Sequence, residues 1–189
     1  ETMASPSRLR QTRSSRSMPA MPGSAARPAA FSAPTEQPMR TEGVTPRLQR
    51  LLDALEVSPA LIKTATWDVV AWNRAAAAVL TDYAALPPGQ RNILRLIFCD
   101  PRVRAAQYDW ESVARFVVGA FRADAARAGA VSEVGELVDE LCKRSPEFEA
   151  LWRDNNVHVH GEGVKRLRHP ILGPIMMEYS AFGVDGRPD

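Results

Sequence analysis

The feature that most constrains this chain is the segregation of its sequence patterns into three blocks. Short stretches rich in β-branched and aromatic residues occupy positions 60–66 and 67–73, and further alternating stretches follow position 156. Between these blocks, apolar residues recur at helical spacing. Strands, then helices, then strands are typical of an α+β fold, because a parallel sheet needs a crossover, usually a helix, between successive strands. The sequence therefore predicts several helices that cover a small antiparallel sheet.

Capping residues, Pro and Gly set the ends of the expected elements. Thr45 and Pro46 suit the N-cap and first position of a helix that Ser58 and Pro59 end. Asp109 is expected to cap the longest helix, Asp100 before Pro101 begins a short turn in the same cap-then-Pro manner, and Ser145 before Pro146 opens a further helix. Further helices are expected at 74–80, 92–98, 110–127, 132–143 and from 146 onward, and strands at 60–66, 67–73, 157–160, 164–169 and 175–182.

Residues 1–43 differ in composition from the rest of the chain and are expected to form a disordered basic tail. They are rich in Ser, Pro, Ala and Arg and hold few large apolar residues, so they cannot bury enough surface to offset chain entropy. Three roles stay open for this segment: an arm that contacts DNA, an organelle transit peptide, or an inert leader. One folded domain is expected over 44–183, with a C-terminal tail at 184–189.

Composition narrows the class of protein. With 189 residues, 45% of them hydrophobic, the chain can form one core, and its net charge of +2 gives no general basic excess that requires nucleic acid. Cys99 and Cys142 lie far apart and lack metal-binding spacing, which predicts reduced thiols in a cytoplasmic protein. No apolar run reaches the roughly 18 residues that span a bilayer, and no secretory signal begins the sequence.

Several stretches, taken together in their order and spacing, resemble the MmyB-like transcription regulators, a bacterial family of XRE-type regulators. They are LQRLLDAL (48–55), WDVVAWNRAAAA (67–78), LPPGQRNILRL (86–96), FCDPR (98–102), DWESVAR (109–115), SPEF (145–148) with LW (151–152), and KRLRHP (165–170). The resemblance runs from about residue 46 to about residue 182.

The resemblance implies a DNA-binding helix-turn-helix followed by a PAS-like ligand-binding domain. It implies a small apolar or amphipathic ligand, fatty acids among them. Residues 1–43 cannot supply a helix-turn-helix, so DNA is expected as a partner only through a segment outside this chain. The sheet of the family continues beyond the strand that matches 175–182, and a missing last strand would leave an unpaired edge. That edge predicts a homodimer, or pairing with a related regulator.

A ligand between the sheet and its helices would contact apolar side chains from both layers. The candidate wall residues are Leu61, Trp72, Leu80, Phe98, Phe116, Val117, Phe121, Trp152, Met176 and Tyr179. The alternative for each of them is simple core packing, which an apolar helical stripe usually reflects. Asn73, where a strand gives way to a helix, is expected to cap that helix.

Two polar clusters complete the candidates. Lys165, Arg166 and Arg168 form the densest basic cluster of the expected domain and are candidates to hold an acidic head group, the alternative being a solvated strand face. His158, His160 and Glu162 have the spacing of metal ligands on one strand face, but alternating valines favour solvated histidines. We therefore predict no metal and no cofactor.

The sequence contains no nucleophile elbow, phosphate-binding loop, dinucleotide fingerprint or zinc-protease motif, so we predict that the protein is not an enzyme. The leading hypothesis is the ligand-sensing domain of a bacterial transcription regulator. The alternative is a truncated interaction or dimerisation module that pairs through its sheet edge and its first leucine-rich helix.

Overall fold

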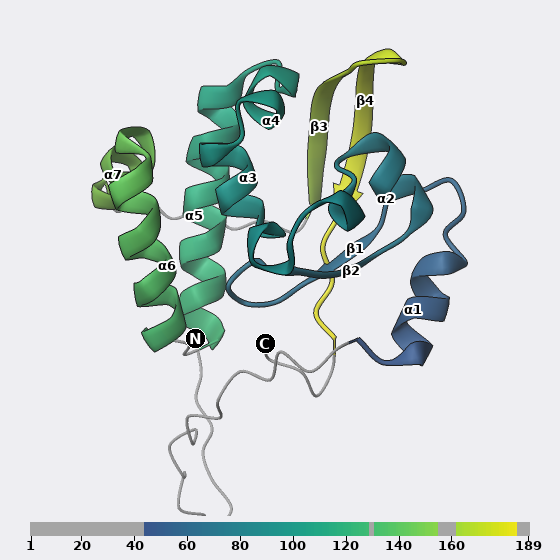
Figure 1. Cartoon of the computed structure of the whole chain (residues 1–189), viewed down its shortest axis with the longest axis horizontal. Helices are drawn as coiled ribbons and strands as arrows, with labels where there is room; N and C mark the ends of the chain where they lie inside the picture. Colours follow the sequence, from purple (N-terminus) through teal and green to yellow (C-terminus); the bar gives the residue numbers. More distant parts are fainter. Residues whose placement is uncertain (1–43, 129–130, 155–161, 185–189) are drawn as a thin grey trace, which may run out of the picture. The chain divides into compact units, whose positions relative to one another are not determined.

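The computed structural model of the chain describes residues 44–128, 131–154 and 162–184 (Figure 1). Seven α-helices and four strands lie in these ranges. The helices are α1 (Pro46–Asp53), α2 (Arg74–Val79), α3 (Ile93–Cys99), α4 (Pro101–Ala106), α5 (Trp110–Ala128), α6 (Val131–Arg144) and α7 (Pro146–Arg153), with 3₁₀ turns at Tyr83–Ala85 and Pro88–Gln90. The strands are β1 (Leu61–Lys63), β2 (Val69–Trp72), β3 (Glu162–His169) and β4 (Gly173–Ser180). This confirms the α+β class.

The strands of the described ranges form two separate antiparallel hairpins rather than one sheet. β1 pairs with β2, and β3 pairs with β4 over the full length of both strands. The turn of the second hairpin places Gly173 at φ +75°, a conformation that glycine adopts without strain. The strand expected at 157–160 and the tail expected at 1–43 lie outside the described residues.

Capping side chains begin most helices where the sequence indicated. Thr45 accepts a hydrogen bond from the amide of Leu48, and Asp100 and Ser145 cap α4 and α7 in the same way, each followed by Pro at the first helical position. The expected end of α1 at Ser58–Pro59 is wrong, because the helix ends at Asp53. The chain after α1 instead turns around Asn73, whose amide nitrogen donates to the carbonyls of residues 52, 55 and 58.

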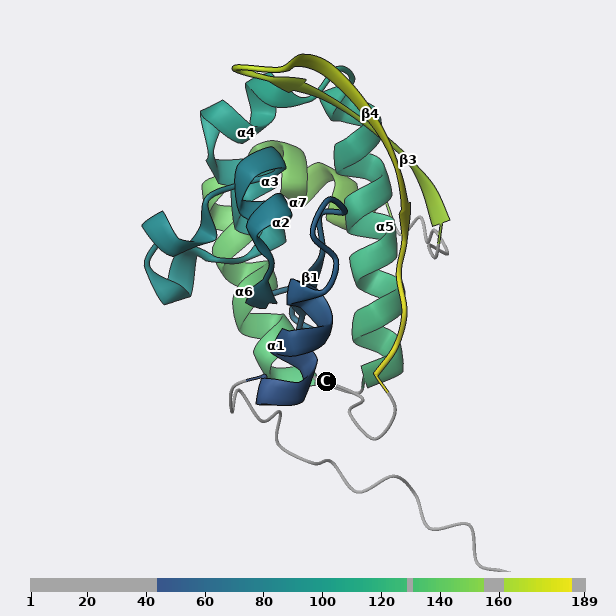
Figure 2. The ribbon, with the colours of Figure 1, turned by 90° about the vertical axis from the view of Figure 1, so that its right-hand side faces the viewer.

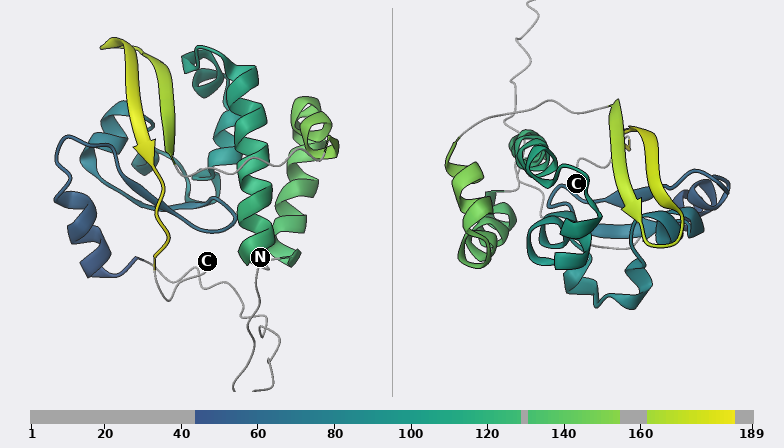
Figure 3. Two further views of the ribbon diagram at one scale, coloured as in Figure 1. Left: turned by 180° about the vertical axis from the view of Figure 1, so that it is seen from behind. Right: turned by 90° about the horizontal axis from the view of Figure 1, so that it is seen from above.

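One apolar core joins helices α3, α5, α6 and α7. Figure 3 shows α5 between the pair α6 and α7 on one side and the β3–β4 hairpin on the other. Phe121 of α5 and Phe148 of α7 are fully buried at the centre of this core, and Trp67 from the β1–β2 turn reaches into it. The apolar stripe of α5 therefore faces the neighbouring helices and forms the centre of this core.

A polar anchor fixes the β1–β2 hairpin to α5. The carboxylate of Asp124 accepts hydrogen bonds from the Lys63 ammonium at 2.8 Å and from the Trp67 indole at 2.9 Å. The Lys63 ammonium also lies 4.2 Å from the centre of the Trp67 ring. Trp67 has a positive φ of 64°, which is strained for a bulky residue. These contacts hold the strained turn in place.

A second ion pair joins α3 to α6 and makes stability depend on acid pH. The Arg95 guanidinium donates to both oxygens of the Glu140 carboxylate, the shortest distance being 2.6 Å. These hydrogen bonds, with a further contribution from Arg144, lower the pKa of Glu140 from 4.5 to about 2. Because the folded pKa lies below the unfolded one, the contribution of Glu140 to stability is present above pH 4.5 and is lost as the pH falls toward 2.

The variant Glu140→Gln tests this linkage. At neutral pH we expect it to be less stable than the native protein by roughly 1 kcal/mol, since the pair is partly screened by solvent. The difference should shrink as the pH falls from 4.5 toward 2, in urea unfolding followed by circular dichroism. Glu133→Gln, an exposed change on the same helix, is the control. A stability difference that stays constant over this pH range would contradict the assignment.

Candidate functional site

The β3–β4 hairpin has two chemically different faces, because neighbouring residues of a strand point to opposite sides. The face that contacts the helices, the inner face, consists of Gly163, Lys165, Leu167, His169, Gly173, Ile175, Met177 and Tyr179. The opposite, outer face consists of Glu162, Val164, Arg166, Arg168, Pro174, Met176, Glu178 and Ser180. The outer face carries four charged residues, two large apolar residues, a proline and a serine. Both faces of the hairpin therefore carry side chains that can contact a ligand or a partner.

Three contacts attach the inner face to the helices, and Figure 2 shows the hairpin running alongside α5. A ring nitrogen of His169 lies 2.9 Å from the carbonyl oxygen of Ala78 at α2. Leu167 forms a β-bridge with Gln107, after α4, and is buried. The Tyr179 ring lies edge-on to Phe116 of α5, with 6.4 Å between the ring centres. The hairpin is thus held near its turn and near its open end.

Lys165 and Met177 form a cross-strand pair between these attachments. Burial lowers the pKa of the Lys165 ammonium, yet the residue as a whole stays exposed to solvent. The nearest aromatic ring is that of Tyr179, whose centre lies 5.7 Å from the ammonium. Among the described residues, no carboxylate forms a salt bridge with Lys165.

The neighbours of Lys165 on the inner face are apolar and only partly covered. Ile175, Met177 and Tyr179 are half-buried, whereas Leu167 is the buried residue of this face. The Tyr179 ring lies directly over Gly163, where even a Cβ atom would come within 2.8 Å of it. Glycine at 163 therefore leaves the space that the Tyr179 ring occupies on the inner face.

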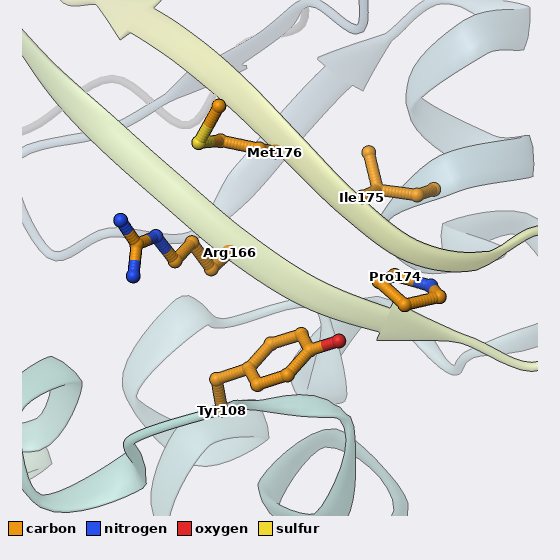
Figure 4. Close-up of a pocket in the computed structure, with 5 residues that line it drawn as sticks. All are labelled: Tyr108, Arg166, Pro174, Ile175 and Met176. Carbon is orange, nitrogen blue, oxygen red and sulfur yellow. The ribbon is translucent and has the colours of Figure 1, made fainter.

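The outer face carries a shallow hollow, drawn in Figure 4. Its volume is about 200 Å³, and its lining comes from the hairpin and from the segment after α4: Tyr108, Arg166, Pro174, Ile175 and Met176. The guanidinium of Arg168 lies 4.5 Å from the centre of the Tyr108 ring, at the same side of the hairpin. This hollow is wide and open, so it suits a surface contact better than an enclosed ligand.

The structure divides the wall residues expected from helices into two groups. Phe98, Val117 and Phe121 lie inside the closed helical core. Phe116 and Trp152 are partly buried at the edge of that core, Trp152 of α7 against Phe121 of α5 and Phe116 toward the hairpin. Phe116 and Tyr179 are thus the two expected wall residues that the fold brings together from helix and hairpin.

The wall residues expected near β1 and β2 lie in a different cluster. Leu61 and Trp72 pack against Val69, Tyr83 and Leu96. The Trp72 ring lies 5.4 Å from that of Tyr83, and the guanidinium of Arg91 covers it at 5.1 Å. Leu80 is half-buried just after α2. No ring contact joins Trp72 to the inner face of the hairpin within the residues described.

The expected basic cluster is split by the alternation of β3. Lys165 lies on the inner face, whereas Arg166 and Arg168 lie on the outer face. The methionine pair is split in the same way, and here the expectation is corrected. Met176 points outward and is 70% exposed, while Met177 lies on the inner face beside Lys165. The contacts of the hairpin with α2, α4 and α5 decide which member of each pair faces inward.

The metal hypothesis rests on His158 and His160, which lie outside the described residues. Within the described ranges, no group of three or more His, Cys, Asp or Glu side chains has an arrangement that could hold a metal ion. Cys99 and Cys142 are free thiols there, and burial raises the pKa of both. No helix in the described part of the chain is long and apolar enough to cross a membrane.

Two buried asparagines, Asn73 and Asn92, form hydrogen bonds to distant segments that the sequence did not predict. Asn73 caps α2, as expected, by accepting from the amide of Ala76 at 2.9 Å. It also accepts from Ala60 and donates to the carbonyl of Leu52 in α1 and to two carbonyls after that helix, so one side chain joins α1, the segment that follows it and α2. Asn92 caps α3 and donates to Thr66 and Asp68 in the β1–β2 turn. For Asn73, its position directly before a helix was the available signal, and it revealed only the cap. Asn92 was expected inside its helix, whereas it precedes α3 as the N-cap.

A helical core beside a hairpin whose inner face is half-covered and carries Lys165 forms an α+β domain. Residues 44–189 match the family model described as the MmyB-like transcription regulator ligand binding domain, and the chain belongs to this family. The suspected resemblance is therefore confirmed, and the chain carries a ligand-sensing regulatory domain of the transcription-regulator type. Comparison with curated proteins finds no match.

Proposed function

We propose that this domain senses a small amphipathic acid, of the fatty-acid type, on the inner face of the β3–β4 hairpin. The observation that carries the proposal is Lys165, an exposed residue of the inner face whose ammonium is partly desolvated and has no carboxylate partner among the described residues. A carboxylate beside this ammonium would form a charge-assisted hydrogen bond in a partly desolvated setting. The acidic head group would thus lie at Lys165, with Arg166 and Arg168 on the far side of the hairpin.

The apolar neighbours of Lys165 suit the tail of such a molecule. Met177 adapts to varied apolar shapes, and Tyr179 with Phe116 forms an aromatic boundary toward α5. Burial of roughly 300 Å² of acyl surface at about 25 cal/mol per Å² contributes about 7–8 kcal/mol. That is comparable with the roughly 8 kcal/mol of a micromolar complex, before the costs of association.

The ligand would act by changing how firmly the hairpin is attached. Its contacts with the rest of the domain include those of His169, Leu167 and Tyr179. A ligand between the hairpin and α5 would favour the hairpin positions that accommodate it, which is the differential binding that regulation requires. In a bacterial transcription regulator, this cytoplasmic signal would reach a DNA-binding segment outside this chain.

Binding of a fluorescent polyene fatty acid tests the proposal. We expect saturable binding by the native chain, and a roughly tenfold or greater loss of affinity in Lys165→Met, because a hydrogen bond to a charged group contributes about 1.5–3 kcal/mol. The methyl ester of the same acid should bind the native chain and Lys165→Met about equally. Lys143→Met, an exposed change on α6, is the matched control.

Two outcomes would reject this assignment. One is the absence of saturable binding by the folded native chain. The other is an unchanged affinity of Lys165→Met for the free acid, which would move the head group away from the hairpin's inner face.

A further inference from the structure

We infer that the outer face of the β3–β4 hairpin is the contact surface for a second copy of this chain. From the open end to the turn, its rows are Glu162 with Ser180, Val164 with Glu178, Arg166 with Met176, and Arg168 with Pro174. Val164 is 56% and Met176 70% exposed, in the middle of the face. Large apolar side chains exposed between charged rows are typical of contact surfaces.

The charges of this face are divided by sign along the strands. Both acids, Glu162 and Glu178, lie in the two rows at the open end, and both arginines lie in the two rows near the turn. Among the described residues, Glu162, Glu178 and Arg166 form no salt bridge, and the guanidinium of Arg168 stacks on Tyr108. The face is therefore acidic at one end and basic at the other, with its charges available to a partner.

Such a face is complementary to itself when one copy is reversed. A two-fold axis in the plane of contact and perpendicular to the strands places the acidic rows of each copy over the basic rows of the other. Glu162 then lies opposite Arg168 of the second copy, twice in the dimer. An axis parallel to the strands would instead bring the arginine rows together and the glutamate rows together. Like charges would oppose that arrangement.

Exposed apolar residues at the two ends of the hairpin also favour the reversed arrangement. Ile171 in the turn and Phe182 beyond the open end are each 87% exposed, and Leu172 is 64% exposed. The reversed arrangement carries the apolar turn of one copy toward the Phe182 end of the other. The reversed arrangement thus pairs Glu162 with Arg168 and brings the apolar ends together, while Val164 and Met176 lie diagonally across the centre. This self-complementarity favours a second copy over an unrelated protein.

The size of the face limits the affinity. Two strands of eight residues measure roughly 26 Å by 10 Å, which is small beside the roughly 800 Å² per partner of a stable complex. We therefore expect a reversible dimer with a dissociation constant in the micromolar range. Sedimentation velocity of the full chain over roughly 1–300 μM should show the shift from monomer to dimer.

Charge reversal locates the contact. Glu162→Arg alone and Arg168→Glu alone should each weaken the dimer about tenfold or more, because each places like charges opposite one another twice. The double variant Glu162→Arg/Arg168→Glu should restore dimerisation, since the pairs are formed again with their signs exchanged. Met176→Glu should weaken the dimer without depending on that exchange, because it places a carboxylate opposite Glu178 of the second copy. Circular dichroism verifies that every variant is folded, and Glu133→Arg on α6 is the control.

A native chain that stays monomeric up to about 300 μM would overturn the inference, as would single reversals that leave the dimer intact. Failure of the double variant to recover would also reject the reversed arrangement. This inference is independent of the proposed ligand, because it concerns the opposite face of the hairpin. Lys165→Met should therefore dimerise like the native chain even where it loses the fatty acid.

Discussion

Replacing Phe121 with alanine is expected to lower the free energy of unfolding by about 3–5 kcal/mol. The side chain is fully buried in the helical core. Its ring lies 6.0 Å from the Trp67 ring in an edge-on arrangement and 5.9 Å from the Trp152 ring. Truncation would remove both aromatic contacts and leave a cavity between the β1–β2 turn, α5 and α7. Thermal unfolding should show a melting temperature lower by about 10 °C or more.

The same measurement separates core packing from ligand binding at this position. Val57→Ala, at a site 90% exposed, should change stability by less than about 0.5 kcal/mol and serves as the control. A loss below about 1 kcal/mol in Phe121→Ala would mean that the interior is not closed there. That outcome would favour Phe121 as the wall of an open ligand cavity and would count against placing the ligand at the hairpin.

Replacing Asn92 with alanine is expected to lower the free energy of unfolding by about 2–3 kcal/mol. Asn92 is fully buried, and its side-chain oxygen accepts from the amides of Leu94 and Arg95 at 3.0 and 3.2 Å. Its nitrogen donates to the carbonyl of Thr66 at 2.8 Å and to Asp68 at 3.0 Å. Alanine removes a helix cap, which costs about 1 kcal/mol, and leaves buried polar groups without partners, which adds about 1–3 kcal/mol.

Urea unfolding of Asn92→Ala measures this loss. Gln90→Ala is the control, since Gln90 is an exposed residue two positions earlier. Asn92→Asp keeps the capping oxygen but loses the amide donor and places a carboxylate beside Asp68. It should therefore also destabilise the fold, and less so at acid pH where the carboxylates take up protons. Native-like stability of Asn92→Ala would show that the β1–β2 turn does not depend on this side chain.

These two residues illustrate what the sequence could and could not predict. Both the helical stripe containing Phe121 and the polar residue before α3 are visible in the sequence. The apolar stripe does not distinguish a Phe121 that lines a cavity from one that fills the core. Nor does the position of Asn92 in the sequence predict its hydrogen bonds to a turn some 25 residues earlier. Both answers depend on which distant segments pack against the helix.

The sequence by itself determined the α+β class, most helix starts and the family. Thr45, Asp100 and Ser145 act within one turn of their own position, so local chemistry is enough to predict their caps. Only the tertiary structure decided that the strands form two hairpins and that Lys165 and Met177 face the helices. A strand's alternation separates two faces but does not orient them. That choice depends on the long-range contacts that attach the hairpin to α2, α4 and α5.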